Sequence, residues 1–324
     1  MATFMIWNAT GSRPWTEVTA ASHTGNASLG HFEAMERIET LVLPCLLSFT
    51  VVLGVAGNSI SLWYITRGKK VSSATAVLLL DLTITNVLVI LASIFYLIHL
   101  IPQIKFTKRL LEAHLLIGTV NIFGNPPFMA CIAIDQYIAV AHPIRCHNWR
   151  RPRYYVALSI VIWLSVLSLS VAAFHFKRNI VDESISCKDK ILMRKPLQIF
   201  MLVCEMVSFV IPVLVLLICY ALTVKKLREV GAGKESMKRM KTQVLRTISG
   251  ILAVLLFCFA PFHIPQLYFS SEGLIGPFNR ILVFYMCHVK IYTWALTSLS
   301  AFLNPMLYIF RSQNFQWRAH CCAV

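Results

Sequence analysis

The chain has few charged residues for its length, and acids are the scarcer kind. Only 14% of its 324 residues are Asp, Glu, Lys or Arg, whereas 57% are apolar; soluble domains carry about 25% charged residues. The length alone would suggest two or three soluble domains, but their cores could not hide so much apolar surface. The 14 acids are outnumbered by 30 Lys and Arg residues, so the chain is strongly basic. We expect a membrane protein.

Features typical of several other protein classes are missing. His and Cys residues show no metal-site spacing, and no nucleophile stands with a base, so we expect no enzyme, no metal and no cofactor. Inverted repeats and paired broken helices, which would indicate a transporter, are not found. Residues 1–30 lack a charged start followed by an apolar core, so no cleavable signal peptide is expected. We expect no nucleic acid among the partners.

Long apolar runs dominate what is present. Crossing ~30 Å of hydrocarbon takes about 20 residues in a helix, and a backbone without water must be helical. Seven runs meet this length: 41–66, 72–100, 111–141, 154–174, 197–224, 244–269 and 281–309. We therefore predict an all-α membrane protein in which residues 39–310 form a bundle of seven transmembrane helices.

The segments at the two ends of the chain indicate its orientation. Two N-glycosylation sequons, at Asn8 and Asn26, lie in the tail formed by residues 1–38. A modest majority of the basic residues falls in the segments that would then face the cytoplasm, which agrees with the positive-inside rule. We expect a multi-pass protein of the plasma membrane with an extracellular, glycosylated N-terminus. Residues 311–324 are expected to form a cytoplasmic interfacial helix and tail.

Polar and helix-breaking residues recur inside the spans, where polar groups are costly. Each of them alone is compatible with Asn and Pro that join or kink helices. Their order along the chain is more specific: Gly57-Asn58, Trp163, Pro212 with Tyr220, Cys258-Phe-Ala-Pro261, and Asn304-Pro305-x-x-Tyr308.

This ordered set resembles the class A, or rhodopsin-like, G-protein-coupled receptors over about residues 40 to 322. Asp135-Gln136-Tyr137 occupies the family's Asp-Arg-Tyr position. The run from Phe257 to His263 and the run Asn121-x-x-Gly-Asn-x-x-Phe are similar to the branch that holds nucleotide, small-carboxylate and lysolipid receptors. The resemblance implies a receptor that transmits binding of an extracellular ligand to a heterotrimeric G protein, to arrestin, or to both. The residues that would carry the signal are Asp135, Gln136, Tyr137, Tyr220, Lys241, Pro261, Asn304, Pro305 and Tyr308.

The chain departs from this family at the expected ion pair. Gln136 replaces the usual arginine, and a neutral amide makes no charge contact. Counting back from Pro261 puts Lys241 where family members often have an acid. Two settings for Asp135 remain open, one solvated at the interface and one paired with an arginine of the second inner loop. Its role is either a polar anchor or a part of signalling.

A second departure concerns the family's sodium site. Asn86 stands where the sodium-binding carboxylate is expected, and it could form a neutral cluster with Asn58, Asn125 and Asn304. Without a carboxylate a sodium ion would be poorly neutralised. Asp81 lies five residues earlier, about 140° around the helix, and should not substitute.

A third departure concerns cysteines. The resemblance implies a bridge between Cys187 and the outer end of the third span, but that position is Leu111. We expect the bridge to be absent and Cys187 to be free or joined to Cys287. Near the C-terminus, Cys321 and Cys322 follow a short segment with aromatic and basic residues, which indicates palmitoylation.

The expected ligand is unknown, with an anion or a lipid favoured. Basic residues crowd the outer connections and would attract an anion, although such side chains can equally snorkel to headgroups. Gln266 replaces a base that nucleotide receptors carry, and Leu115 and Leu116 offer no base in the third span, so a lipid acid or small carboxylate fits better than a nucleotide. The residues expected to face the ligand are Tyr96, His99, Glu205, His263, Gln266, Lys290 and Trp294.

Two functions follow from these patterns. Tyr220, Tyr308 and the basic inner connections favour a ligand-regulated receptor that couples to G proteins. Gln136 favours the alternative, a receptor-fold protein that signals weakly, as a decoy or as a heteromer partner.

Overall fold

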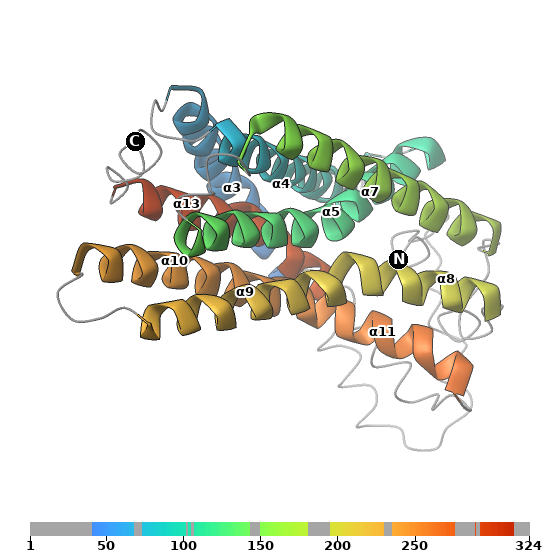
Figure 1. Cartoon of the computed structure of the whole chain (residues 1–324). Coiled ribbons are helices and arrows are strands. Elements are labelled where there is room, and N and C mark those ends of the chain that lie inside the picture. Colours follow the sequence, from blue (N-terminus) through green and yellow to red (C-terminus); the bar gives the residue numbers. More distant parts are fainter. Residues whose placement is uncertain are drawn as a thin grey trace, which may run out of the picture.

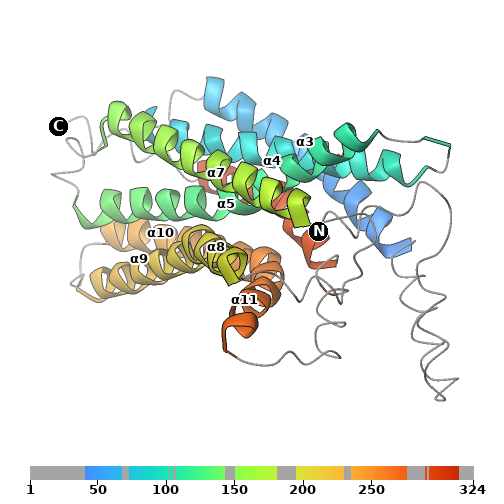
Figure 2. The same cartoon turned by 90° about the vertical axis from the view of Figure 1, so that its right-hand side faces the viewer.

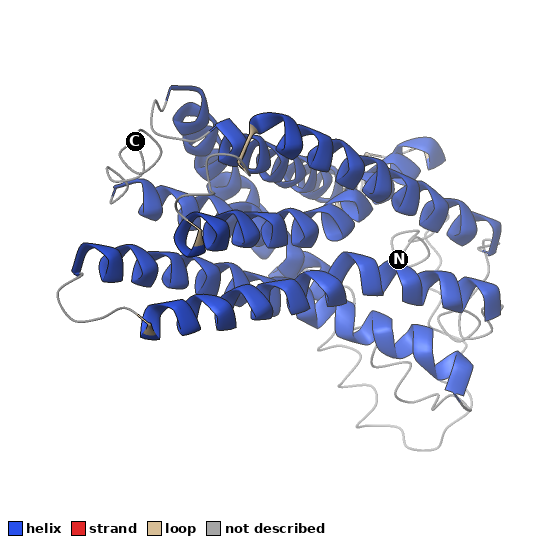
Figure 3. Ribbon diagram, in the orientation of Figure 1, coloured by secondary structure: helices blue, strands red, loops and turns tan. Residues whose placement is uncertain are grey.

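The computed structural model describes residues 41–67, 73–101, 103–104, 107–142, 150–180, 195–229, 235–275, 289 and 292–313. Within these ranges the chain is helical and carries no strand (Figure 3). Long helices lie side by side in one bundle, as the two views agree (Figures 1 and 2). This arrangement confirms the predicted all-α architecture.

The helices follow the predicted spans closely. The α-helices are α3 Leu43–Arg67, α4 Ser73–His99, α5 Lys108–Ala141, α7 Pro152–Ile180, α8 Lys195–Glu205, α9 Ile211–Arg228, α10 Glu235–Val254, α11 Ala260–Ile275 and α13 Ser300–Gln313. Two π-helical turns, η4 Met206–Val210 and η5 Leu255–Phe259, join α8 to α9 and α10 to α11. Six continuous helical stretches among the described residues are long and apolar enough to cross a membrane. The seventh predicted span is described at residue 289 and from residue 292 onward.

The outward surface of the bundle is apolar. On α7 the side chains of Val161 and Leu164 are 59% and 61% exposed, and Phe257 in the sixth span is 77% exposed. A soluble protein would hide such side chains, whereas lipid solvates them. The exposed apolar face is therefore what surrounding hydrocarbon requires.

Helix α5 lies at the centre of the bundle and contacts α4, α7, α9 and α10. It begins after Thr107, whose hydroxyl accepts a hydrogen bond from the backbone N–H of Leu110 at 3.4 Å. Its inward residues include Asn121, Asn125 and Asp135, all fully buried. The polar residues that the sequence marks out are thus carried by the most enclosed helix.

Prolines shape three of the long helices. Each π turn precedes a proline, η4 before Pro212 and η5 before Pro261. A helical proline donates no hydrogen bond and clashes with the carbonyl four residues earlier, and a widened turn accommodates both effects. In α5, the consecutive prolines Pro126 and Pro127 stand in the helix interior. They remove the hydrogen bonds that the carbonyls of residues 122 and 123 would otherwise accept.

Close helix contacts fix the position of the last span. A Cβ on Gly57 of α3 would lie 3.2 Å from a side-chain carbon of Pro305 on α13. One residue later, the amide nitrogen of Asn58 donates to the backbone carbonyl of Ala301 at 2.7 Å. The Gly-Asn pair therefore acts jointly: the glycine permits the approach and the asparagine bonds across it.

The inner connection between the fifth and sixth spans is short. Helix α9 ends at Arg228 and α10 begins at Glu235, and residues 230–234 between them lie outside the described residues. The basic residues of the last turn of α9 suit the negative end of the helix dipole. At the other end of the chain, α13 continues to Gln313, past the expected boundary at residue 310.

Several expectations lie outside the described residues. They concern the glycosylation sites Asn8 and Asn26, the cysteines Cys187, Cys287, Cys321 and Cys322, and Lys290. The backbone of Leu111 and Tyr308 is described, but the placement of their side chains is not.

Candidate functional site

Asp135 is enclosed at the end of α5 near His142, where its carboxylate accepts hydrogen bonds from four residues. Thr75 at the start of α4 donates to Oδ2 at 2.9 Å, and Tyr155 near the start of α7 donates to Oδ1 at 3.0 Å. Gln136 donates its side-chain amide to Oδ2 at 3.2 Å. The carboxylate is 0% exposed, so the solvated setting is excluded. We call Asp135, Thr75, Arg150, Tyr155 and Gln136 the Asp135 cluster.

Arg150 is the charged partner within the Asp135 cluster. It stands just before α7, and its guanidinium donates from Nε to Oδ1 at 2.6 Å and from Nη2 to Oδ2 at 2.9 Å. The same Nη2 lies 2.5 Å from the hydroxyl of Thr75. An arginine–carboxylate pair with two hydrogen bonds is among the strongest polar contacts in proteins. Of the two settings expected for Asp135, the structure shows the arginine of the second inner connection.

Gln136 and Lys241 take separate roles in this arrangement. Gln136 is 0% exposed and its amide is turned to the neighbouring carboxylate. Lys241, at the inner end of the sixth span, donates its ammonium to the backbone carbonyl of Lys226 on α9 at 3.0 Å. Tyr137 packs against a buried apolar cluster that includes Ile132 and Ile248, and its ring has an edge-on contact with His142. The sixth span is therefore joined to the fifth by a lysine, without the family's acid.

The C-terminal end of α9 carries a second ion pair. The ammonium of Lys226 lies 2.7 Å from a carboxylate oxygen of Glu229, one turn later. The hydrogen bond from Lys226 holds the pKa of Glu229 below its ordinary value, and nearby lysines act in the same direction. The two side chains are 38% and 46% exposed, so solvent screens their charges and the ion pair is weak.

A cluster of asparagines joins four helices in the middle of the bundle. Asn86 on α4 donates to Asn58 at 3.2 Å and accepts from Asn125 at 3.2 Å and from Asn304 at 3.1 Å. Asn125 also donates to Asn121 at 3.1 Å and accepts from Asn304 at 3.1 Å. The structure thus brings Asn58, Asn86, Asn125 and Asn304 together and adds Asn121. We call these five residues the asparagine cluster.

Asp81 stands apart from the asparagine cluster. Its carboxylate accepts a hydrogen bond from the indole nitrogen of Trp163 on α7 at 2.9 Å. The expected turn of about 140° around the helix from Asn86 accounts for this separate direction. Trp163 of the sequence motif thus has a partner that joins α4 to α7.

Glu205 and His263 form a buried pair between the fifth and sixth spans. Oε2 of Glu205 lies 2.5 Å from Nδ1 of His263, and the side chains are 1% and 0% exposed. The imidazole stacks on Phe209 with ring centroids 4.4 Å apart and meets Phe262 edge-on at 5.4 Å. Glu205 immediately precedes η4, and His263 follows η5 by one turn. The two π turns therefore flank the contact that bridges these helices.

An aromatic group lies beside this pair. Tyr96 on α4, His114 on α5 and Trp294 lie with ring centroids 5.8–6.3 Å apart. Phe262, which contacts His263, belongs to the same buried apolar cluster as Trp294, and Tyr96 packs against this cluster. The aromatic group and the Glu205–His263 pair are therefore connected through shared apolar neighbours. Four of the expected ligand-facing residues are in this way brought to one region of the bundle.

The remaining expected ligand residues are less concentrated. Gln266 is buried on α11 and its amide lies 3.4 Å from the hydroxyl of Ser270, one turn further out. His99 ends α4. Among the described residues, no group of three or more His, Cys, Asp or Glu side chains is placed to hold a metal ion.

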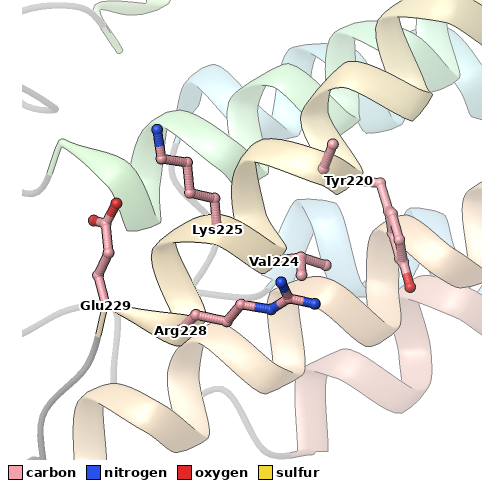
Figure 4. Close-up of a pocket in the computed structure, with 6 residues that line it drawn as sticks. Tyr220, Val224, Lys225, Arg228 and Glu229 are labelled. Carbon is pink, nitrogen blue, oxygen red and sulfur yellow. The ribbon is translucent and has the colours of Figure 1, made fainter.

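A pocket opens at the C-terminal end of α9 (Figure 4). It has a volume of about 460 Å³ and is lined by Tyr220, Ala221, Val224, Lys225, Arg228 and Glu229. One expected signalling residue, Tyr220, thus borders a hollow that is rimmed by basic side chains. Figure 4 shows the phenol of Tyr220 and the guanidinium of Arg228 extending toward the same part of this pocket.

Comparison with known proteins agrees with the fold and the motifs. Residues 57–308 match the family described as "7 transmembrane receptor (rhodopsin family)". The chain belongs to this family, and its fold is the seven-helix receptor bundle. Its predicted class, with motifs near the nucleotide-receptor branch, is confirmed.

Individual receptors are similar at a lower level. The human uracil nucleotide/cysteinyl leukotriene receptor is 25% identical over 285 residues, which cover 86% of this chain and 76% of that receptor. A rat purinoceptor is 27% identical, covering 87% and 79%. The rat somatostatin receptor type 4 is also 27% identical, covering 85% and 71%. These relatives are receptors, which fits a membrane receptor that is not an enzyme.

Sequence reasoning missed several partners in these sites. Thr75 and Tyr155 carry no pattern that separates them from other polar residues at helix ends. His114 belongs to no motif, although a histidine near the outer end of an apolar span is a polar group that invites a functional interpretation. Asn121 stands in a run that resembles the family, but its place in the cluster was not predicted.

Proposed function

We propose that this chain is a ligand-regulated receptor of the plasma membrane that couples to heterotrimeric G proteins. The observation that carries the proposal is the ion pair between Arg150 and Asp135. It supplies, from a different segment, the positive charge that Gln136 lacks, and it ties the inner ends of α4, α5 and α7. A resting state held by a specific polar contact is the property that a ligand-driven switch requires.

The proposed orientation places the N-terminus outside the cell, with Asn8 and Asn26 glycosylated, and Cys321 and Cys322 palmitoylated at the cytoplasmic face. The pocket beside Tyr220 then lies on the cytoplasmic side, where the G protein would bind. Arrestin is a further partner that the same surface would accommodate. The domain limits proposed from the sequence are a tail at 1–38, the helical bundle at 39–310 and an interfacial segment at 311–324.

For the ligand, we propose a lipid acid or small carboxylate bound near the Glu205–His263 pair and the aromatic group. Support comes from the basic outer connections of the sequence and from the buried apolar cluster that contains Trp294 and Phe262 and against which Tyr96 packs. One relative is named for uracil nucleotides and cysteinyl leukotrienes, one for purines and one for somatostatin, so the names alone do not decide the class. The ligand residues in this proposal are Tyr96, His99, Glu205, His263, Gln266, Lys290 and Trp294.

A second function, a weakly signalling decoy or heteromer partner, is favoured by one observation. Gln136 is fully buried and neutral, and its side-chain amide donates a hydrogen bond to Asp135. Gln136 therefore offers no positive charge to a G protein in this structure. The two proposals differ in whether release of the Asp135 cluster permits coupling.

The deciding experiment is a G-protein dissociation panel in cells that express the chain without added ligand. Wild type and Arg150→Ala are compared at matched surface expression, with the exposed Arg153→Ala as control. We expect Arg150→Ala to raise basal dissociation of at least one G-protein class, since it releases the resting contact, and Arg153→Ala to behave as wild type. If no class responds to either receptor, and the addition of candidate lipid acids changes nothing, the decoy function stands instead.

A further inference from the structure

The positive charge that family members place at position 136 has no counterpart at that position here. Gln136 is neutral and fully buried. Arg150 is 8% exposed, and its guanidinium is engaged by Asp135 and Thr75. Neither residue therefore presents a cation to the cytoplasmic pocket in this structure.

Arg228 does present a cation to the cytoplasmic pocket. It lies in the last turn of α9, two turns after Tyr220, and its side chain is exposed. Figure 4 shows that the guanidinium turns toward the part of the pocket that the Tyr220 phenol also reaches, whereas Lys225 points away from that phenol. The basic side chain and the hydroxyl thus offer hydrogen-bond donors from two positions on one wall.

The neighbouring charges leave Arg228 available. Glu229 is paired with Lys226 at 2.7 Å, and Lys241 is held on the carbonyl of Lys226 at 3.0 Å. With the described residues Arg228 makes neither a hydrogen bond nor an ion pair, and Lys225 acts on Glu229 electrostatically without forming an ion pair with it. The pocket rim is therefore positive, and a partner that fits it carries carboxylates.

We infer that Arg228 supplies the cation of the cytoplasmic pocket and binds a carboxylate of the transducer's inserted peptide segment. Guanidinium binds a carboxylate with two parallel hydrogen bonds, which an ammonium or an amide does not reproduce. In the family one arginine pairs with the neighbouring acid at rest and contacts the G protein when the receptor is active. Here Arg150 pairs with Asp135 at rest, and Arg228 binds the carboxylate of the G protein. This inference rests on the proposed coupling to G proteins.

The test uses the purified full-length chain in nanodiscs of phosphatidylcholine, so that no anionic lipid competes for the pocket. The probe is a synthetic peptide of the C-terminal helix of a G-protein α-subunit, one for each class that the dissociation panel reports. A neutral version has every Asp and Glu changed to Asn and Gln and an amidated C-terminus. Binding is measured for wild type, Arg228→Gln and the matched control Lys225→Gln, which removes the same charge one turn away.

The expected result is that Arg228→Gln weakens binding of the acidic peptide about tenfold, as loss of one charge-assisted contact implies. Lys225→Gln should change it much less, and the neutral peptide should bind wild type and Arg228→Gln alike. Equal binding of the acidic peptide by wild type and Arg228→Gln would overturn the inference while leaving the proposed function intact. If wild type binds no α-subunit peptide and releases no G protein in cells, the proposed function fails and the inference fails with it. Thermal unfolding of Arg228→Gln should match wild type, because the side chain is exposed.

Discussion

Arg150 donates two hydrogen bonds to Asp135, at 2.6 and 2.9 Å, from a position that precedes α7 by two residues. The contact crosses from the second inner connection to the third span and is buried at both ends. Removing one partner of such a pair leaves an uncompensated charge, whereas removing both does not.

Arg150→Ala should therefore lower the stability of the resting receptor. Breaking a buried ion pair from one side costs about 3–5 kcal/mol, and the double variant Arg150→Ala, Asp135→Asn should recover part of this loss. Thermal unfolding of detergent-purified protein measures both, with Arg153→Ala as the exposed control. An unchanged unfolding temperature for Arg150→Ala would mean that the pair does not hold the three helix ends.

A second prediction concerns Gln136. An arginine introduced there stands next to Asp135 and can replace the lost guanidinium, so Gln136→Arg should restore stability in the Arg150→Ala background. In the wild-type background, where Arg150 already pairs with Asp135, Gln136→Arg should also strengthen G-protein coupling, because the cytoplasmic side gains a further cation. Unfolding temperature and stimulated G-protein dissociation report the two effects. Gln136→Lys is the control, since an ammonium lacks the planar fork that matches a carboxylate. A double variant no more stable than Arg150→Ala would refute the replacement.

Sodium should not stabilise this receptor. Within the asparagine cluster the amide oxygens of Asn58, Asn86, Asn121 and Asn125 already accept hydrogen bonds, and only Oδ1 of Asn304 is left without a donor. One neutral oxygen is a poor site for a cation that requires several oxygen ligands. Unfolding temperatures in sodium and choline salts of equal ionic strength should agree.

Asn86→Asp is the informative counterpart to that measurement, because it places a carboxylate among the same neighbours. It should create a saturable, sodium-specific rise in unfolding temperature. A saturable gain in the wild type that Asn86→Ala abolishes would show that the cluster binds sodium without a carboxylate.

The Glu205–His263 contact predicts a strong coupling between two substitutions. Glu205→Leu or His263→Phe alone leaves one polar group buried beside Phe209 without its partner, and each should destabilise the receptor by several kcal/mol, about 3–5 at most. The double variant should be nearly as stable as wild type, since both polar groups are gone. A double-mutant cycle of unfolding measurements gives the coupling energy, and additive losses would contradict a direct pair.

The proposed orientation predicts N-linked glycans on the tail. Treatment of the expressed protein with an N-glycosidase should reduce its mass on a gel, and the variant Asn8→Gln, Asn26→Gln should lack the shift. A wild type whose mass does not change on treatment would remove the support for an extracellular N-terminus.

The fold was largely predictable because hydrocarbon leaves a long apolar segment only one regular structure. The asparagine cluster was predictable for a related reason. Hydrocarbon offers polar side chains no hydrogen-bond partner, so those inside the spans bond to one another. Asp135 was harder to place: its partner comes from a connection between helices, and no periodicity shows which of several arginines reaches it. The π turns also escaped detection. Each inserts a residue into the helix, so the count from Pro261 back to Lys241 crosses a change of phase that no spacing rule reveals.

The consecutive prolines of α5 divide the most enclosed helix into two blocks. The outer block carries Asn121 and Asn125, and the inner block carries Asp135. Across the joint between them, two neighbouring backbone hydrogen bonds are absent, so a tilt of one block against the other disrupts fewer backbone hydrogen bonds than it would in an uninterrupted helix. The two blocks of α5 can therefore change their relative angle more easily than the halves of an uninterrupted helix. Displacement at the asparagine cluster can be absorbed at Pro126 and Pro127, and the Asp135 cluster can stay closed until a larger movement arrives.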